Sequence, residues 1–282
     1  MRLVIGGRDV SELVTRVQTS GSRKEAARTL TAEIIQSATD PNIPTVELAL
    51  EAAVEFVSDG DAPQKFSGKV FGLSRTTGGS TITVTAQDRG VELTSGEKTV
   101  TKKVTGASPS AAAAEFIAAA GFSAGNLASA PGTVARKFVD VDAYDAIMAG
   151  YILSGQQNDT SYVLRVDGDT VNIEEFGSEI VGHLSEAANL QAATYGEELD
   201  YKAGEEDAPG AWTSGQKATV QGLDCPQAVT GKAIKVTEKF TGLTGVFFID
   251  SDVHTWSGAT YTNKLTLVFD RMSSAAAAGE EI

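Results

Sequence analysis

The sequence predicts an α+β fold that is mainly β, with β regions at both ends of the chain and a small α+β unit between them. In the N-terminal third, short runs of alternating apolar residues are separated by turns rich in glycine and threonine, as in half-buried strands. Between residues 108 and 155, apolar residues recur at helical spacing instead. Alternation returns beyond residue 232. With 282 residues, the chain has room for about two domains.

Residues 1–98 are expected to form the first β domain. A strand is predicted over 30–37, where the alternation is clear and two prolines follow, because proline removes a backbone donor and fixes φ. A second strand is predicted over 54–57. The segments 66–75 and 80–87 predict a hairpin, since both alternate and a glycine turn joins them.

Residues 99–195 are expected to form the small α+β domain. A helix is predicted over 108–121, because a serine followed by a proline favours a helix start and a glycine favours its end. A second helix, over 142–155, carries one apolar stripe. The Asp-Gly turn at 167–169 lies between two alternating segments and predicts a hairpin.

The remaining chain divides into three parts. Residues 196–231 are acidic and rich in turn residues, so we expect a linker or a reduced connecting region. Residues 232–272 alternate again and are predicted to form hairpin strands that complete a second β domain. Residues 273–282 are low in complexity and are expected to form a flexible tail.

Two hairpin segments of the sequence resemble each other. Residues 67–89 begin with Ser-Gly-Lys-Val-Phe and end with Asp-Arg, and residues 244–271 begin with Thr-Gly-Val-Phe-Phe and end with Asp-Arg. Coincidence is the competing explanation, because alternating segments are common. A true duplication predicts two related β domains on either side of the α+β unit.

Charge and composition exclude several classes of protein. The formal net charge of −14 disfavours binding to nucleic acid or to anionic lipid. Cys225 is the single cysteine, and His183 and His254 are the two histidines, so neither an intrachain disulfide nor a thiolate- or histidine-rich metal centre is expected. Apolar runs are far shorter than the ~20 residues of a membrane span, and the first residues lack the core of a signal peptide. Synthesis in a reducing cytoplasm, without a cofactor, is therefore expected.

One group of side chains could carry chemistry. Asp250, Asp252 and His254 alternate along a predicted strand and would share a face, where two carboxylates and an imidazole could hold a metal or perform acid–base catalysis. The competing interpretation is the polar outer face of a hairpin, with Phe247, Ile249 and Val253 turned inward.

A second group is basic. Arg23, Lys24 and Arg28 form the one basic cluster in an acidic chain. They form either a solvated hairpin tip or a contact for an acidic protein neighbour, where complementary charge sets the register. No group in the sequence predicts an enzyme.

Several segments, taken in order, resemble the baseplate hub family of contractile phage tails and related injection systems, the late control D-like tail hub proteins. The segments are 5–14, 20–21, 26–30, 39–44, 66–71, 136–139, 143–147, 156–158, 245–256, 261–262 and 265–267. The most specific is Gly245-Val246-Phe247-Phe248-Ile249-Asp250-Ser251-Asp252-Val253-His254-Thr255-Trp256. The resemblance covers 1–195 and 232–270. It fails over 196–231, where similar hubs carry a longer stretch.

The resemblance implies a structural protein without enzymatic activity. Each subunit would carry two tube-like β-barrel or sheet domains that flank the α+β domain, so three subunits would assemble as a trimeric ring with pseudo-sixfold symmetry. One face of this homotrimer would meet the sixfold tail tube or a tube-initiator protein, and the other would seat the threefold central spike protein. Other baseplate proteins are implied partners, the tape measure protein is a further candidate, and DNA would be only passing cargo.

The resemblance also implies a location in the tail or injection-system baseplate, after synthesis in the host bacterial cytoplasm. An acidic pore lining that repels DNA is expected from the net charge. The interface candidates are Arg23, Lys24, Arg28, Asp250, Asp252, His254 and Trp256.

Two other functions compete with the hub. A surface-exposed carbohydrate- or protein-binding β module would need clustered exposed aromatic side chains, and the two tryptophans, Trp212 and Trp256, lie on separate segments. A hydrolase would use the acidic residues and the histidine of the 250–254 strand, and an assay of the His254→Ala variant would separate it from the hub.

Overall fold

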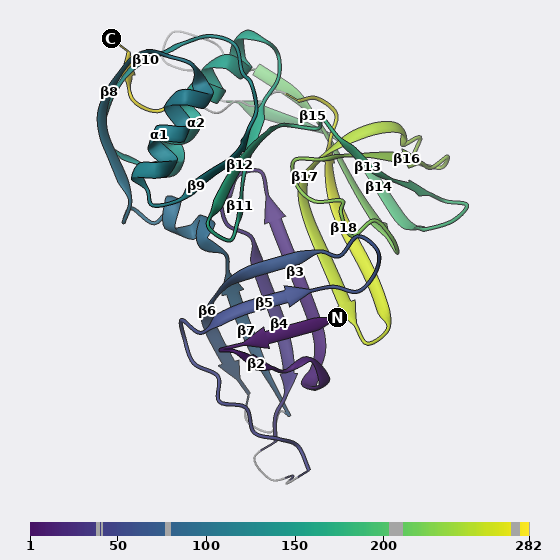
Figure 1. The fold of residues 1–282 in the computed structure, drawn as a ribbon. Helices are drawn as coiled ribbons and strands as arrows, with labels where there is room; N and C mark the ends of the chain where they lie inside the picture. The colour runs from purple at the N-terminus through teal and green to yellow at the C-terminus, as the bar shows by residue number, and fades with distance from the viewer. Residues whose placement is uncertain (38–39, 41, 77–79, 203–210, 272–276, 282) are drawn as a thin grey trace.

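A computed structural model describes residues 1–37, 40, 42–76, 80–202, 211–271 and 277–281. It confirms the α+β, mainly β class, because strands dominate and two α-helices lie together in the middle unit (Figure 1). The strands form one sheet of thirteen strands and two sheets of three. Among the described residues, no helix has the length and apolar character to cross a bilayer.

The N-terminal β unit has six main strands, in the order β3-β4-β7-β6-β5-β1, and the short strand β2 extends its edge. The strands are β1 (Arg2–Ile5), β2 (Arg8–Asp9), β3 (Val14–Ser22), β4 (Thr29–Ile35), β5 (Ala53–Val57), β6 (Lys65–Arg75) and β7 (Thr81–Gln87). Leu30, Ala32 and Ile34 of β4 are buried, as the alternation predicts. All the strands predicted here are present, and the predicted turn at 77–79 lies outside the described residues.

The middle unit contains both helices, as predicted. Its elements are β8 (Thr99–Ala107), α1 (Pro109–Ala119), β9 (Ser123–Leu127), β10 (Val134–Asp142), α2 (Ala143–Gln157), β11 (Tyr162–Asp167) and β12 (Thr170–Glu175). Helix α1 begins as expected, because the Ser108 hydroxyl accepts a hydrogen bond from the Ala111 amide at 3.3 Å. Just beyond its end, Gly121 has a φ of +81°, the left-handed conformation that favours glycine.

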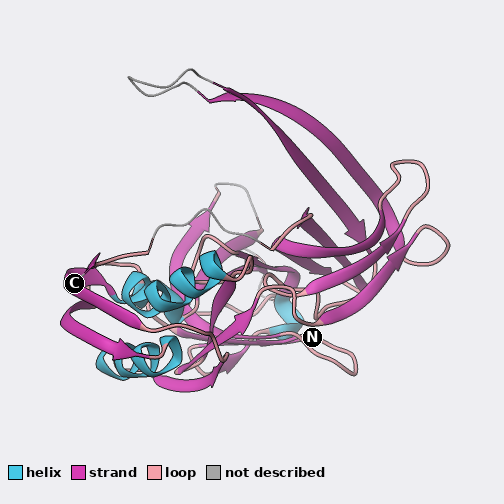
Figure 2. Ribbon diagram, turned by 90° about the horizontal axis from the view of Figure 1, so that it is seen from above, coloured by secondary structure: helices cyan, strands magenta, loops and turns pink. Residues whose placement is uncertain are grey.

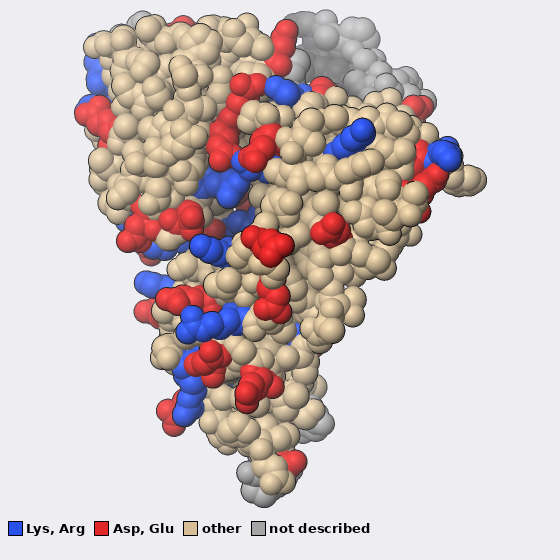
Figure 3. All heavy atoms as spheres, turned by 45° about the vertical axis from the view of Figure 1, so that its right-hand side comes forward, with Lys and Arg blue, Asp and Glu red and all other residues tan. Residues whose placement is uncertain are grey.

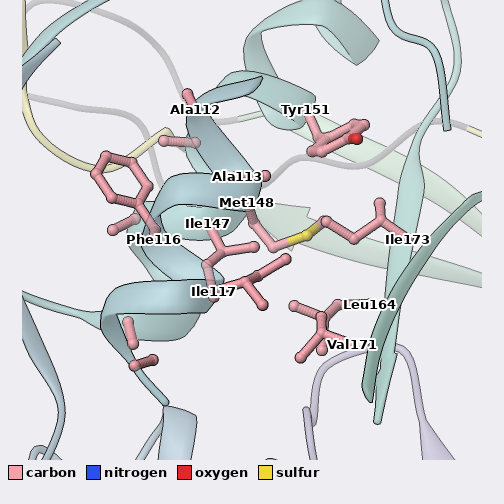
Figure 4. Close-up of a cluster of buried hydrophobic side chains, with 14 of the residues drawn as sticks. Ala112, Ala113, Phe116, Ile117, Ile147, Met148, Tyr151, Leu164, Val171 and Ile173 are labelled. Atoms are coloured by element: carbon pink, nitrogen blue, oxygen red, sulfur yellow. The ribbon is translucent and has the colours of Figure 1, made fainter. Parts of the chain in front are cut away.

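The core of the middle unit lies between its helices and a small sheet. Helices α1 and α2 pack against each other, and β11 pairs with β12. Figure 4 shows Ile117 and Met148 of the helices pointing toward Leu164, Val171 and Ile173 of the two strands. All five side chains are buried, so this unit has a core of its own.

The C-terminal β unit joins the same large sheet as the N-terminal unit. Its strands are β13 (Ile180–Ser185), β14 (Leu190–Lys202), β15 (Ala211–Gly222), β16 (Ala233–Thr237), β17 (Thr244–Ser257) and β18 (Thr260–Val268). Strands β14 and β15 form a long antiparallel hairpin that projects from the body of the molecule (Figure 2).

This hairpin differs from the linker predicted over 196–231. Much of the described part of that region lies in β14 and β15, whereas residues 203–210 lie outside the described residues. Ala193, Tyr195 and Val220 pack into the core of the C-terminal unit. The acidic and turn-rich composition obscured this alternation, because the outward positions of a half-buried hairpin tolerate charge.

The end of the chain also differs from the predicted flexible tail over 273–282. Residues 273–276 and 282 lie outside the described residues, but β19 (Glu280–Glu281) pairs with β10. The two glutamates lie opposite Lys137 and Arg136, and opposite charges across a strand pair favour pairing. The low complexity of the preceding alanines hid this short acidic strand.

The two β units have the same strand order and the same path of the chain. The order β14-β15-β18-β17-β16-β13 corresponds strand for strand to β3-β4-β7-β6-β5-β1. One pairing differs, since β13 and β16 are parallel whereas β1 and β5 are antiparallel. The resembling segments 67–89 and 244–271 fall on equivalent hairpins, β6–β7 and β17–β18.

Two β-bulges occur at equivalent positions in the two units. Against β7, β6 carries the extra residue Phe71, and against β18, β17 carries Asp250 in the corresponding place. Strands β3 and β14 carry the extra residues Thr15 and Gln191, again in corresponding places. A bulge shifts the pairing of all residues beyond it. The shared bulges therefore align the two units residue by residue.

Candidate assembly site

The two β units meet at one strand pair, which we call the internal seam. The second half of β17, from Ser251 to Ser257, pairs antiparallel with β3, from Ser22 to Arg16. The first half of β17 pairs with β16 of its own unit. The internal seam therefore makes one continuous sheet from two similar units.

The bulge at Asp250 decides which residues of β17 point inward at the internal seam. Before the bulge, Phe247 and Ile249 are buried, and after it Asp252 and His254 are buried, with exposed fractions of 1% and 0%. The predicted polar outer face, with Val253 turned inward, is therefore wrong. Alternation in a sequence does not reveal a bulge, which reverses the inward face of the strand.

Asp252 is held by an arginine and a threonine. The Arg28 guanidinium donates two hydrogen bonds to the carboxylate, Nη1 to Oδ1 at 3.0 Å and Nη2 to Oδ2 at 2.5 Å. The amide and hydroxyl of Thr230 both donate to Oδ1 at 2.7 Å. Burial alone would raise the pKa of Asp252, but the positive charge of Arg28 and a hydrogen bond from His254 hold it well below its usual range.

A glycine makes room for this ion pair. A Cβ atom at Gly21 would lie 2.4 Å from Arg28 Nη1 and 3.3 Å from Asp252 Oδ1. Gly21 lies directly opposite Asp252 on β3. The ion pair thus depends on the absence of a side chain at this position.

His254 has a full set of partners inside the chain. Its Nδ1 lies 2.6 Å from the Tyr261 hydroxyl, and its Nε2 lies 3.1 Å from the Ala228 carbonyl and 3.3 Å from Asp252 Oδ2. Both ring nitrogens of His254 therefore have a hydrogen-bond partner. Since His254 and Asp252 are both enclosed, they form a structural network that a substrate would not reach.

Asp88, which directly follows β7, joins the network at the internal seam through Arg28. Its carboxylate accepts hydrogen bonds from the Arg28 amide at 3.0 Å and from the Gly90 amide at 2.8 Å. Burial raises the pKa of Asp88 to about 6, although both hydrogen bonds and the Arg28 charge oppose this. One residue, Arg28, therefore binds Asp252 through its side chain and Asp88 through its backbone.

The predicted basic cluster is divided by the fold. Arg28 points into the seam, whereas Arg23 pairs with Asp250 at 2.9 Å and lies over the Phe176 ring at 4.6 Å. Lys24 is exposed. Of these three cations, Lys24 is the one that remains open to another protein.

The other predicted site residues are also separated. Trp256 is buried, with its ring 5.0 Å from that of Phe56, so it does not offer an exposed surface for a sugar. Asp250 forms an ion pair with Arg23 and does not lie in a cluster with Asp252 and His254. Within the described residues, no group of three potential metal ligands is found.

Sequence reasoning missed Thr230, Tyr261 and Asp88 as members of this network. Their positions carry no motif, because each joins the network from a different segment, Tyr261 from the neighbouring strand β18 and the other two through tertiary folding. The close spacing of Asp252 and His254 was the one signal of this network that the sequence offered.

A cleft of about 580 Å³ lies near the internal seam, lined by residues of all three units. The Lys232 ammonium lies 2.7 Å from Glu174 Oε2 and 2.6 Å from Glu179 Oε2. Arg165 also faces Glu174, at 3.9 Å. These charges satisfy one another, so the cleft resembles a polar contact between units more than a ligand site.

Among the edges of the large sheet that stay unpaired in the described residues, two matter for assembly. Strand β14 pairs with β15 on one side, and the second half of β6, from Gly72 to Arg75, pairs with β7 on one side. Phe71, at the bulge of β6, is 54% exposed. Open edges with free backbone groups are the usual places where a further strand can add.

This arrangement is similar to the folds of two tail proteins and of a secretion-system component. The 43 kDa tail protein of prophage MuSo2 from Shewanella oneidensis is similar over 95% of this chain and 97% of its own, with a TM-score of 0.68 and 13% identity. A tail protein from Neisseria meningitidis MC58 is similar over 94% and 95%, with a TM-score of 0.63 and 14% identity. The c3393 protein of Escherichia coli, a type VI secretion system component, is similar over 99% and 79%, with a TM-score of 0.56 and 11% identity.

The sequence itself gives the family. Residues 17–203 match the family described as YQBQ-like, and the chain belongs to it. No curated protein matches the chain.

Proposed function

We propose that the protein is a structural hub of a tail or injection-system baseplate, in which three copies form a ring. In this role it adapts the threefold central spike protein to the sixfold tail tube. The duplication of the β unit carries the proposal, because three chains with two equivalent units each present six similar units around one axis. Equivalent units let one assembly satisfy both symmetries.

The similar proteins support a structural role in a tail. Two of them are named as tail proteins, and the third is described as similar to the T4 bacteriophage tail proteins gp27 and gp5. The buried state of Asp252 and His254 is consistent with this role and offers no support to a hydrolase at that strand.

The proposal places the protein in the tail baseplate, with the spike, the tube or its initiator, and other baseplate proteins as partners. The acidic pore lining remains a prediction. On the face in Figure 3, acidic and basic side chains are interleaved, so an acidic lining would have to lie elsewhere.

The test is co-expression of the full chain with the spike and tube proteins encoded beside it, followed by light scattering and imaging. A complex that contains three copies of the chain around one axis is the expected result. A chain that stays monomeric in the presence of both partners would overturn the proposal.

A further inference from the structure

The internal seam provides a template for a second seam between chains. The strands that meet in it are β17 of the C-terminal unit and β3 of the N-terminal unit. Their equivalents in the opposite units are β6 and β14, and in the described residues both have an open edge where the internal seam has a partner strand. Each chain therefore has one unused copy of each half of the same junction.

We infer that β6 of one chain pairs antiparallel with β14 of a second copy, in the register of the internal seam. This inference rests on the proposed ring and specifies how its subunits join. Because the two open edges differ, the contact is heterologous, and repetition closes a ring if the rotation allows it.

The shared bulges define the register. Asp252, Val253 and His254 of β17 correspond to Leu73, Ser74 and Arg75 of β6, because both sets follow the bulge at the same distance. Likewise, Gly21, Ser20 and Thr19 of β3 correspond to Glu197, Gly196 and Tyr195 of β14.

The internal pairs can then be transferred to the second seam. Asp252 lies opposite Gly21, Val253 opposite Ser20, and His254 opposite Thr19. The corresponding pairs between chains are Leu73 with Glu197, Ser74 with Gly196, and Arg75 with Tyr195.

The side chains at the two open edges suit this register. Arg75 and Glu197 are both exposed and would lie diagonally on the same face, within reach of an ion pair. The Tyr195 hydroxyl donates to Glu197 Oε1 at 2.5 Å, which holds the carboxylate beside the strand. A Cβ atom at Gly196 would meet no heavy atom within 4 Å, so this edge is open to a neighbour.

Disulfide trapping tests the register. In the Ser74→Cys/Gly196→Cys variant, the two thiols of neighbouring chains lie opposite each other, where Cβ atoms are about 4.5–5.5 Å apart, and they should cross-link on mild oxidation. The matched control is Ser74→Cys/Thr194→Cys, which is displaced by two residues on the same face. Single-cysteine variants control for Cys225, which is buried.

Covalent dimers and trimers on non-reducing gels, several-fold more abundant than in the displaced control, are the expected result. If light scattering shows a trimer but the control cross-links equally well, the register is wrong and the hub proposal stands. If neither variant cross-links and the chain does not associate with or without its partners, the hub proposal fails as well.

A charge exchange gives a second, independent measurement. Arg75→Glu should weaken association on the order of tenfold, because it places like charges across the seam, and Glu197→Arg in the same chain should restore it. Arg8→Glu on β2, also an exposed arginine, is the control. A double variant no better than Arg75→Glu alone would contradict the pairing.

Discussion

The internal seam and the open edges are built from equivalent strands, but their side chains differ in kind. At the internal seam, Asp252 is enclosed with Arg28, and Gly21 leaves the space that they need. At the open edges, the positions of Asp252 and Gly21 are occupied by Leu73 and Glu197. A junction that folds within one chain can bury an ion pair. The open edges of β6 and β14 are in contact with solvent before a second chain binds, and their charged side chains in the described residues are exposed.

The largest effect on stability is expected when the buried carboxylate of Asp252 is removed. Asp252→Ala should lower the free energy of unfolding by about 3 kcal/mol, because it leaves the largely buried Arg28 charge and two Thr230 donors without their acceptor. Glu33→Ala, which breaks an exposed ion pair with Arg16 on the same sheet, should cost less than about 1 kcal/mol. Equal losses in urea unfolding would show that the buried ion pair does not stabilise the internal seam.

Asp88 should make stability depend on pH. Its pKa of about 6 in the folded chain exceeds that of an unfolded aspartate, so between about pH 4 and pH 6 the folded chain retains a proton that the unfolded chain has lost. Stability should therefore fall as pH rises through this range, by about 2–3 kcal/mol in total.

The Asp88→Asn variant isolates this dependence. The difference between its unfolding free energy and that of the wild type should change from pH 4 to pH 6 and then level off. Asp61→Asn, which alters an exposed carboxylate, is the control. Parallel curves for the wild type and Asp88→Asn would rule out this role of Asp88.

A pair of glycine substitutions compares the two junctions directly. Gly21→Ala should destabilise the chain by about 1–3 kcal/mol, because the new methyl group would collide with the Arg28 guanidinium. Gly196→Ala, on the open edge, should leave stability within about 0.5 kcal/mol. Thermal unfolding of both variants measures these losses of stability. A smaller loss for Gly21→Ala than for Gly196→Ala would contradict the expected difference between the two junctions.

The smallest effect on stability is expected for Lys24→Glu, since this side chain is exposed. If Lys24 contacts an acidic neighbour, the same variant should reduce recovery of partners in co-purification. Arg23→Glu is a less specific test, because it also breaks the pair with Asp250 and the contact with Phe176. Unchanged recovery with Lys24→Glu would remove Lys24 from the set of interface residues.

The sequence predicted the local elements well where one signal was sufficient. The cap at Ser108 and the regular burial along β4 are local properties, and both are found. The hairpin β14–β15 was missed because its acidic composition outweighed a real alternation.

The candidate site was less predictable, for a physical reason. The inward turn of His254 depends on the bulge at Asp250, and a bulge has no sequence signal of its own. Arg28 and Asp252 were each identified as polar candidates, but their contact depends on tertiary folding. The resemblance between two hairpin segments, together with the resemblance to the hub family, anticipated the relation of the two units.

The internal seam also has a consequence for synthesis of the chain. Arg28 and Asp252 are 224 positions apart, with the whole middle unit between them. During synthesis on the ribosome, one edge of β3 therefore stays unpaired until β17 has emerged. Pairing between strands so far apart in the chain is slow. During this interval, the same edge of β3 matches β17 of a neighbouring nascent chain, and exchange of identical elements between chains is a characteristic misassembly of multidomain proteins.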